Sequence, residues 1–262
     1  MDALVSIPGA EPWSSAGRGE RRHVATVVVH GITASPVTTR PLGQRLAAEG
    51  YSVEVPLLPG HGTSFRELGR TRYPDWYRAV EELVEQLAER CEQVVLIGHS
   101  MGGTISLDLA SRRPELVGAL AVINPQVVAP SQPLAKVAPL LQHVVPYLPR
   151  DLAGMPTNDM VRPDGDESAY GMIPSKAMQS FLGQLPRIRS QLLDLTQPLL
   201  VVRSLVDHTV NPMSSTELLE RTASRDLREV VCERSYHLPQ VDLDAEKVTE
   251  AIVDFVADVT GS

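Results

Sequence analysis

The chain has 262 residues, enough for one large α/β domain with an insertion, and its formal net charge of −8 offers no basic surface to a nucleic acid. Its two cysteines, Cys91 and Cys232, exclude a disulfide-rich scaffold and are typical of a reducing compartment. The first 23 residues contain no apolar run of signal-peptide length, and no stretch approaches the roughly 20 apolar residues of a membrane span. We therefore expect a soluble, cytoplasmic protein without stable membrane insertion.

The first half of the chain alternates strands and helices. Residues 6–22 are a Gly-, Pro- and Ser-rich lead-in without clear periodicity, for which a lid over the fold and a partly frayed terminus are both open. A continuous, largely β-branched run at 24–29 is typical of a strand buried on both faces of a parallel sheet. The pattern then predicts a helix at 36–50, a strand at 51–58, a helix at 75–90, a strand at 94–97, a helix at 104–111 and a strand at 116–123. This alternation favours a doubly wound, mostly parallel sheet.

The pattern changes between residues 125 and 197. Prolines break this stretch into short pieces, and its 73 residues are too many for a bare connection. The content of Leu, Val, Met and Phe is too high for a disordered linker, and apolar helical segments are predicted at 134–145 and 176–185. We therefore expect residues 125–197 to form a small helical cap, inserted into an α/β core that comprises residues 1–124 and 198–262.

Alternation resumes after this insertion. The pattern predicts a strand at 198–204, a helix at 214–222, a strand at 228–233 and an amphipathic helix at 245–259. Asp207 and His237 follow these two strands directly. Active-site groups of an open α/β sheet gather at the carboxyl ends of its strands, so these side chains are candidates for catalysis.

Ser100 lies between a predicted strand and a predicted helix. The sequence Gly-His-Ser-Met-Gly-Gly at 98–103 places glycines two residues before and two residues after this serine. A serine on so sharp a turn has strained backbone angles, and only neighbours without side chains fit beside it. Strand, turn and helix around Gly-x-Ser-x-Gly form a nucleophile elbow, which exposes the hydroxyl at the edge of the sheet.

Two backbone amides are candidates for an oxyanion hole beside this serine. Met101 follows the nucleophile at the start of the helix, where N–H groups and the positive end of the helix dipole face the site. Ile32 follows His30-Gly31 at the end of the first core strand, and a glycine there lets the backbone approach the substrate. We assign the oxyanion hole to the amides of Ile32 and Met101.

Ser100, Asp207 and His237 together predict a catalytic triad. A hydroxyl is a poor nucleophile at neutral pH, so His237 would take its proton and return it to the leaving alcohol. Asp207 would hold the imidazole in the correct tautomer and stabilise its charged form. His61 and His99 are expected to form local hydrogen bonds that shape loops. No metal-ligand spacing is visible, so we expect neither a metal nor another cofactor.

The chain resembles the α/β-hydrolase serine esterases, and most closely the bacterial monoacylglycerol lipases and related small carboxylesterases. The resemblance is carried by the order of the triad and by the segments at 9–13, 30–31, 59–62, 98–103, 207–208 and 235–237. It spans nearly the whole chain and is weakest at 127–162. It implies an α/β-hydrolase fold with a helical cap, and a serine hydrolase that cleaves a fatty acyl ester of glycerol through an acyl-enzyme without a cofactor.

The resemblance also implies two residues that bind the substrate. In that family, a cap glutamate and an asparagine that follows the strand after the elbow line a polar pocket for the glycerol head group. The matching residues here are Glu167 and Asn124. The sequence between 130 and 160 departs from the lipases and is richer in proline, which leaves the acyl-chain length and the choice of head group open.

Three alternatives to a monoacylglycerol lipase follow from the same residues. One is a general carboxylesterase, and another is an acyltransferase that passes the acyl group to another alcohol through the same acyl-enzyme. The third is a binding protein that has kept the fold without turnover, and the complete triad argues against it. Exposed apolar residues of a helical cap would suit a homodimer or a membrane surface, and the sequence does not decide between them. The expected partner is a small acyl ester such as a monoacylglycerol.

Overall fold

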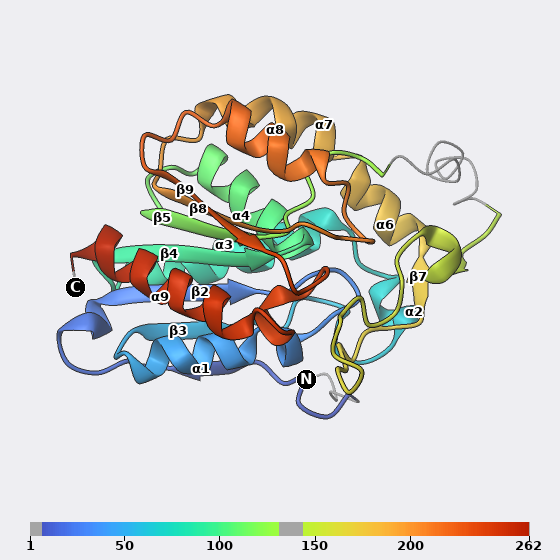
Figure 1. Ribbon diagram of the computed structural model, residues 1–262, viewed down its shortest axis with the longest axis horizontal. Helices are drawn as coiled ribbons and strands as arrows, with labels where there is room; N and C mark the ends of the chain where they lie inside the picture. The colour runs from blue at the N-terminus through green and yellow to red at the C-terminus, as the bar shows by residue number, and fades with distance from the viewer. Residues whose placement is uncertain (1–6, 131–143, 262) are drawn as a thin grey trace.

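A seven-stranded sheet forms the centre of the computed structural model, which describes residues 7–130 and 144–261 (Figure 1). The strand order is β1-β3-β2-β4-β5-β8-β9, and every neighbouring pair is parallel except β1 and β3. The strands are β1 (Trp13–Ser15), β2 (Val24–Val29), β3 (Ser52–Val55), β4 (Gln93–His99), β5 (Ala119–Ile123), β8 (Leu199–Ser204) and β9 (Leu227–Cys232). The predicted doubly wound, mostly parallel sheet is therefore confirmed.

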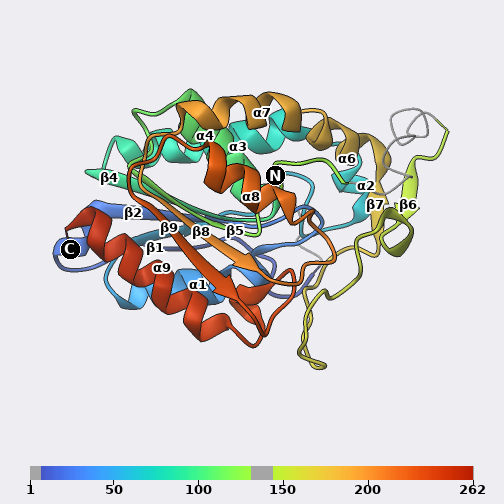
Figure 2. The same cartoon turned by 45° about the horizontal axis from the view of Figure 1, so that its top comes forward.

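Helices cover both faces of this sheet. One face carries α1 (Arg40–Ala48) and α9 (Ala245–Thr260). The opposite face carries α3 (Tyr73–Ala88), α4 (Met101–Arg112), α7 (Leu185–Gln191) and α8 (Met213–Arg221), as Figure 2 shows from a second direction. Each face has its own apolar core, and successive residues of β2 alternate between them: Val27 and Val29 lie in one core, and Val24 and Val28 lie in the other. This two-sided burial explains why β2 reads as an unbroken apolar run.

The lead-in of the chain contains an edge strand, β1, and the amide of Ile7 donates to the carbonyl oxygen of Gly62, so the expectation of a frayed end is wrong over the described part of residues 6–22, while a lid stays a prediction. Trp13 pairs with Val55 in an antiparallel β1–β3 register, and a 3₁₀ turn at Glu20–His23 leads into β2. Gly17 has a φ of 70°, and a Cβ there would lie 2.7 Å from the carbonyl oxygen of Gly50. Three residues are too few to show the alternation of a strand, so β1 could not be predicted from its own sequence and forms by pairing with the edge of β3.

The predicted core elements are present, with boundaries that differ by a few residues. The predicted strand at 51–58 ends at Val55, and the one at 116–123 begins at Ala119. The predicted helix at 36–50 consists of a 3₁₀ turn at Pro36–Thr38 followed by α1. The predicted helix at 176–185 is α6 (Ser175–Leu182), which ends at Gly183, and α7 begins two residues later with a proline at its second position.

The described part of the region between β5 and β8 lies mainly beyond the carboxyl ends of the parallel strands. Its elements there are β6 (Tyr147–Pro149), β7 (Met172–Pro174), a 3₁₀ turn at Asp151–Ala153 and α6, next to α2 (Phe65–Leu68) (Figure 1). The strands β6 and β7 form a small antiparallel sheet of their own. α7 instead contributes Leu185 and Ile188 to the core beside α4.

Two expectations for this region stay open. Most of the helix predicted at 134–145 falls outside the described residues, and the assignment of residues 125–197 as one cap stays a prediction. A further 3₁₀ turn at Leu192–Asp194 follows α7, and another at Pro239–Val241 precedes α9. Within the described parts of the chain, no helix has both the length and the apolar character needed to cross a membrane.

Candidate active site

Ser100 occupies a strained turn between β4 and α4. Its φ is 53° and its ψ is −121°, a combination that residues with a side chain rarely adopt. A Cβ on Gly98 would lie 2.5 Å from the carbonyl group of Gly102, and one on Gly102 would clash with the carbonyl oxygen of Val29. Both glycines are thus required by close backbone approach, as expected for a nucleophile elbow.

The loop after β2 lies directly against this serine. A Cβ on Gly31 would stand only 3.1 Å from Cβ of Ser100, so the backbone that leads to Ile32 borders the site. Neither the amide of Ile32 nor that of Met101 has a hydrogen-bond acceptor within residues 7–130 and 144–261. Both N–H groups therefore stay our candidates for the oxyanion hole.

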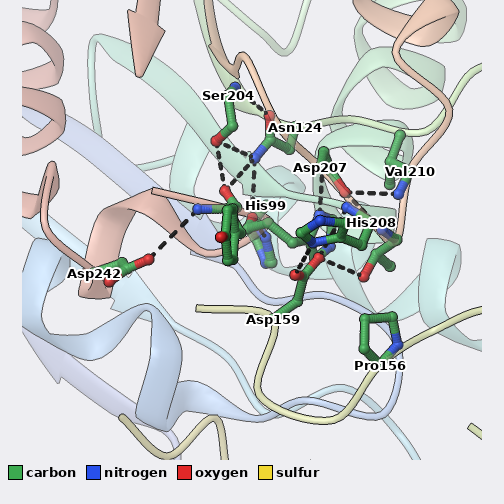
Figure 3. A network of polar contacts seen from close by, with 12 residues as sticks. His99, Asn124, Pro156, Asp159, Ser204, Asp207, His208, Val210 and Asp242 are labelled. Atoms are coloured by element: carbon green, nitrogen blue, oxygen red, sulfur yellow. Dashed lines mark hydrogen bonds and ion pairs between the residues drawn. The ribbon is translucent and has the colours of Figure 1, made fainter. Parts of the chain in front are cut away.

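Asp207 and His237 meet at the carboxyl ends of β8 and β9. The Nδ1–H group of His237 donates to Oδ2 of Asp207 at 2.8 Å, and both side chains are buried. The other carboxylate oxygen, Oδ1, accepts the amides of Thr209 and Val210 at 2.8 Å each (Figure 3). With Nδ1 protonated, Nε2 of His237 is the ring nitrogen that can take a proton.

Charge around His237 favours its role as a base. Burial lowers the pKa of His237, but the carboxylate of Asp207, with smaller contributions from Asp159 and Glu167, outweighs burial and raises that pKa above 6.5. Burial conversely raises the pKa of Asp207, and the His237 ring together with the two amides lowers it below its usual range. The pair is therefore arranged to keep Asp207 ionised and to stabilise a protonated His237.

Ser100 is next in the chain to His99, which contacts His237. Within the described residues no hydrogen bond joins the side chains of Ser100 and His237, and such bonds often tighten only when substrate is bound. His99, the residue before Ser100, contacts His237 directly. Its Nε2–H donates to the carbonyl oxygen of His237 at 2.9 Å, and the centroids of the two imidazole rings are 4.7 Å apart.

Asn124 anchors the loop that carries His237. Its Nδ2 group donates to the carbonyl oxygen of His237 at 3.0 Å and to Oγ of Ser204 at 3.1 Å, while its Oδ1 accepts the amide of Ser204 at 2.9 Å (Figure 3). The hydroxyl of Ser204 in turn donates to the carbonyl oxygen of Tyr236 at 2.5 Å. Both N–H donors of Asn124 are thus occupied by the protein. Asn124 therefore has no free N–H group for the expected contact with a glycerol head group. The same network includes Ser204, which the sequence analysis missed.

Glu167 is buried, not part of a solvated acidic surface. Only 3% of Glu167 is exposed, and its Oε1 forms an ion pair with Arg150, which is equally buried. The backbone amide of Glu167 donates to Oδ1 of Asn158 at 2.9 Å. Its second carboxylate oxygen, Oε2, has no protein partner in the described part of the chain. No sequence signal identified Arg150, because its partner is fixed only by the folded backbone.

The remaining buried histidines are neutral. Burial lowers the pKa of His30 to about 4 and that of His99 to about 3, and it also lowers the pKa of His61 well below 6.5. The Nδ1–H of His30 donates to the carbonyl oxygen of Gly31 at 2.8 Å, and its Nε2 accepts the amide of Leu58 at 3.1 Å. No group of His, Cys, Asp or Glu side chains among the described residues has the arrangement of a metal site.

Comparison with known proteins identifies relatives over nearly the whole chain. The family model described as "Serine aminopeptidase, S33" matches residues 20–244. A thermostable monoacylglycerol lipase from Bacillus sp. (strain H-257) is 31% identical over 255 residues, which cover 97% of each chain. A monoacylglycerol lipase from Mycolicibacterium smegmatis is 27% identical over 250 residues and 87% of each chain.

Solved structures show the same fold. A structure reported for the metagenome-derived lipolytic enzymes LipS and LipT superposes on this chain with a TM-score of 0.88 at 27% identity. The match covers 96% of this chain and 99% of the other. The monoacylglycerol lipase of Paleococcus ferrophilus superposes with a TM-score of 0.79 at 22% identity, covering 95% and 99%. The elements that carry Ser100, Asp207 and His237 thus belong to an architecture shared with lipolytic enzymes.

Proposed function

This chain belongs to the serine aminopeptidase S33 family and is a hydrolase of the lipase and esterase type with an α/β-hydrolase fold, and we propose that it cleaves monoacylglycerols to glycerol and a fatty acid. The similarity to a monoacylglycerol lipase over 97% of both chains supports the choice of substrate. The hydrogen bond between Asp207 and His237, beside the elbow of Ser100, is the observation that carries the proposed chemistry.

The proposed reaction has two halves. His237 accepts the proton of Ser100 through Nε2 while the hydroxyl oxygen attacks the ester carbonyl, and the amides of Ile32 and Met101 stabilise the oxyanion. The intermediate collapses, the C–O bond to glycerol breaks, and the protonated His237 returns the proton to the leaving alkoxide. Water then attacks the acyl-enzyme with His237 again as base, and the fatty acid leaves as Ser100 recovers its proton. Asp207 stays ionised throughout and holds the ring.

Glu167 supports glycerol as the leaving alcohol. Its free Oε2 is an acceptor for a glycerol hydroxyl, while Arg150 fixes its other oxygen. A buried carboxylate that has lost water gains more from such a bond than an exposed one does, because the competing solvent is absent. Methyl and aryl esters offer no hydroxyl to this oxygen, so Glu167 would distinguish alcohols without altering the triad.

A panel of esters with a common acyl chain tests the proposal. We expect wild-type protein to prefer 1-monoacylglycerols over methyl and p-nitrophenyl esters of the same acid. Glu167→Gln keeps the size of the side chain and removes its charge, so kcat/KM for monoacylglycerols should fall about 10- to 100-fold while the aryl ester changes less than about twofold. Asp164→Asn, in an exposed carboxylate three residues away, is the matched control and should behave as wild type.

Each outcome separates one part of the proposal. Equal rates on all alcohols would identify a general carboxylesterase and reject the head-group role of Glu167. Equal losses on both ester classes in Glu167→Gln would make this residue structural. Ser100→Ala that keeps more than a few per cent of wild-type activity would reject Ser100 as the nucleophile.

A further inference from the structure

Residues 159–162, which we call the 159–162 segment, contact both the loop after β8 and the loop after β9; Figure 3 shows Asp159 beside His208 and Asp207. At one end, the Asp159 side chain contacts the loop after β8. At the other end, the amides of Val161 and Arg162 donate to the two oxygens of Asp242, in the loop after β9, at 2.8 and 3.0 Å. One short segment from the region between β5 and β8 is therefore bonded to the loops of both the acid and the base.

Among residues 7–130 and 144–261, every hydrogen bond of the Asp159 carboxylate comes from the two residues that follow Asp207. Its carboxylate is buried, with Oδ1 at 2.7 Å from Nδ1 of His208. Its Oδ2 accepts the amide of His208 and the hydroxyl of Thr209, both at 3.1 Å. The amide of Thr209 donates to Asp207 itself. The turn that orients the carboxylate of Asp207 is thus held from the other side by Asp159.

A second contact connects the two loops through the same residues. The ring of His208 packs edge-on against that of Tyr236, with centroids 4.6 Å apart, and Tyr236 directly precedes His237. The amide of Tyr236 also donates to Asp242 at 3.4 Å. Asp159, His208, Tyr236 and Asp242 therefore form a continuous series of contacts that begins and ends on the 159–162 segment.

We propose that Asp159 is a positioning residue for the triad: it holds the turn after Asp207 so that this carboxylate meets Nδ1 of His237. The inference rests on the proposed function only in requiring that Asp207 and His237 are the acid and the base. Asp159 lies outside the triad and touches neither Ser100 nor the His237 ring in the described contacts. Its effect on the reaction passes through His208 and Thr209.

Asp159 also acts on His237 through its charge. The groups with an electrostatic effect on His237 are Asp207, Asp159 and Glu167, of which Glu167 is paired with Arg150, and the neutral ring of His99 lies alongside. Loss of the negative charge of Asp159 lowers the pKa of His237, because the protonated ring then has one favourable neighbour fewer. The acid limb of the pH profile of kcat/KM must then move to lower pH.

Asp159→Asn and Asp159→Ala test this role with p-nitrophenyl butyrate as substrate. For Asp159→Asn, which keeps the shape, we expect kcat to fall about 3- to 10-fold, KM to stay within twofold, and the acid limb to move to lower pH. For Asp159→Ala, which leaves three donors unpartnered, we expect a loss of about 100-fold in kcat, since small displacements of catalytic groups have effects of this size. Asp254→Asn, at an exposed position of α9, is the control and should change neither kcat nor the limb.

A double-mutant cycle with His208→Ala gives a second measure. If Asp159 acts through His208, the loss of kcat in the double variant should be close to that of the more impaired single variant, and clearly smaller than the product of the two single losses. Fully multiplicative losses would contradict the pathway. Circular dichroism and Tm identify a variant that fails to fold, in which case Asp159→Asn decides.

The outcomes that overturn the inference differ from those that overturn the proposed function. Wild-type kcat and an unmoved acid limb in Asp159→Ala would reject the role of Asp159, and so would a raised KM with unchanged kcat, which would indicate substrate binding instead. NMR titration of the His237 ring in wild type and Asp159→Asn measures the expected decrease in the pKa of His237 independently of catalysis. Failure of wild type on monoacylglycerols alone, with the aryl ester still cleaved, would reject only the proposed substrate.

Discussion

Two Asp–His pairs lie next to each other in this molecule, and consecutive residues contribute to them. Asp207 binds Nδ1 of His237 at 2.8 Å, and Asp159 binds Nδ1 of His208 at 2.7 Å. Both carboxylates are buried, with 6% and 3% of their side chains exposed, but the imidazole of His237 is 5% exposed and that of His208 is 49% exposed. The hydrogen bond is nearly the same in the two pairs. The surroundings of each imidazole must therefore distinguish His237, the candidate base, from His208, a structural contact.

The surroundings differ in what each ring can reach. His237 is enclosed beside the Ser100 elbow, where burial opposes its protonation and nearby carboxylates favour it. The ring of His208 is half exposed to solvent, and apart from Asp159 its described contact is the edge-to-face packing on Tyr236. A carboxylate that binds an imidazole is therefore weak evidence of catalysis unless the ring is also enclosed next to a nucleophile.

Replacement of each histidine by glutamine gives the largest contrast. His237→Gln removes the only group placed to take the proton of Ser100 in the proposed mechanism, and kcat should fall by about 10⁵- to 10⁶-fold, as for other triad histidines. His208→Gln keeps an N–H donor for Asp159, so its loss should stay below about tenfold. Steady-state hydrolysis of an aryl ester measures both. Comparable losses in the two variants would contradict the difference between the pairs.

Replacement of each aspartate by asparagine gives a smaller contrast. Asp207→Asn should lower kcat by about 10⁴-fold, because an amide cannot hold His237 in the required tautomer or stabilise its charged form. Asp159→Asn should cost only the 3- to 10-fold expected for a positioning residue. In wild type the base must be neutral, and the raised pKa of His237 places the acid limb of kcat/KM above pH 6.5, with activity falling as pH decreases through it. A limb below pH 6.5 in wild type would contradict this arrangement.

The sequence predicted the parts of the site that depend on local backbone geometry. The elbow at Ser100 was predictable because its glycines are required within two residues of the serine, and Asp207 and His237 because each follows a strand whose carboxyl end faces the site. The central strands were predictable for a related reason, since strands buried on both faces read as apolar runs. These features are set by neighbours in the chain.

The features that the sequence analysis missed depend on residues far apart in the chain. Asn124 meets Ser204 across 80 positions, and Asp159 meets His208 across 49. Neither Ser204 nor Asp159 differs in type or spacing from many exposed serines and aspartates, so no local pattern could single them out. The edge strand β1 was missed for a similar reason, because its pairing depends on β3 more than on its own three residues.

A third group of histidines sharpens the comparison through stability. His30, His61 and His99 are buried without a carboxylate as hydrogen-bond partner, so their folded pKa values lie below 6.5, at about 4 for His30 and about 3 for His99. Below pH 6.5 the unfolded chain therefore binds more protons at these positions than the folded chain does, and the free energy of unfolding decreases as pH falls. His237, whose folded pKa is raised, contributes with the opposite sign, and its stabilising contribution is lost as pH rises through that pKa.

Urea unfolding at pH 7.5 and pH 5.5 measures the decrease in the free energy of unfolding between these two pH values, which should be about 1 kcal/mol for each of the three buried histidines. His61→Gln removes one of them, so its free energy of unfolding should depend on pH less steeply than that of wild type by about that amount. His23→Gln, at an exposed position, is the matched control and should keep the wild-type dependence. The same dependence in His61→Gln and in wild type would mean that His61 is not held neutral, and burial alone would then not distinguish these histidines from His208.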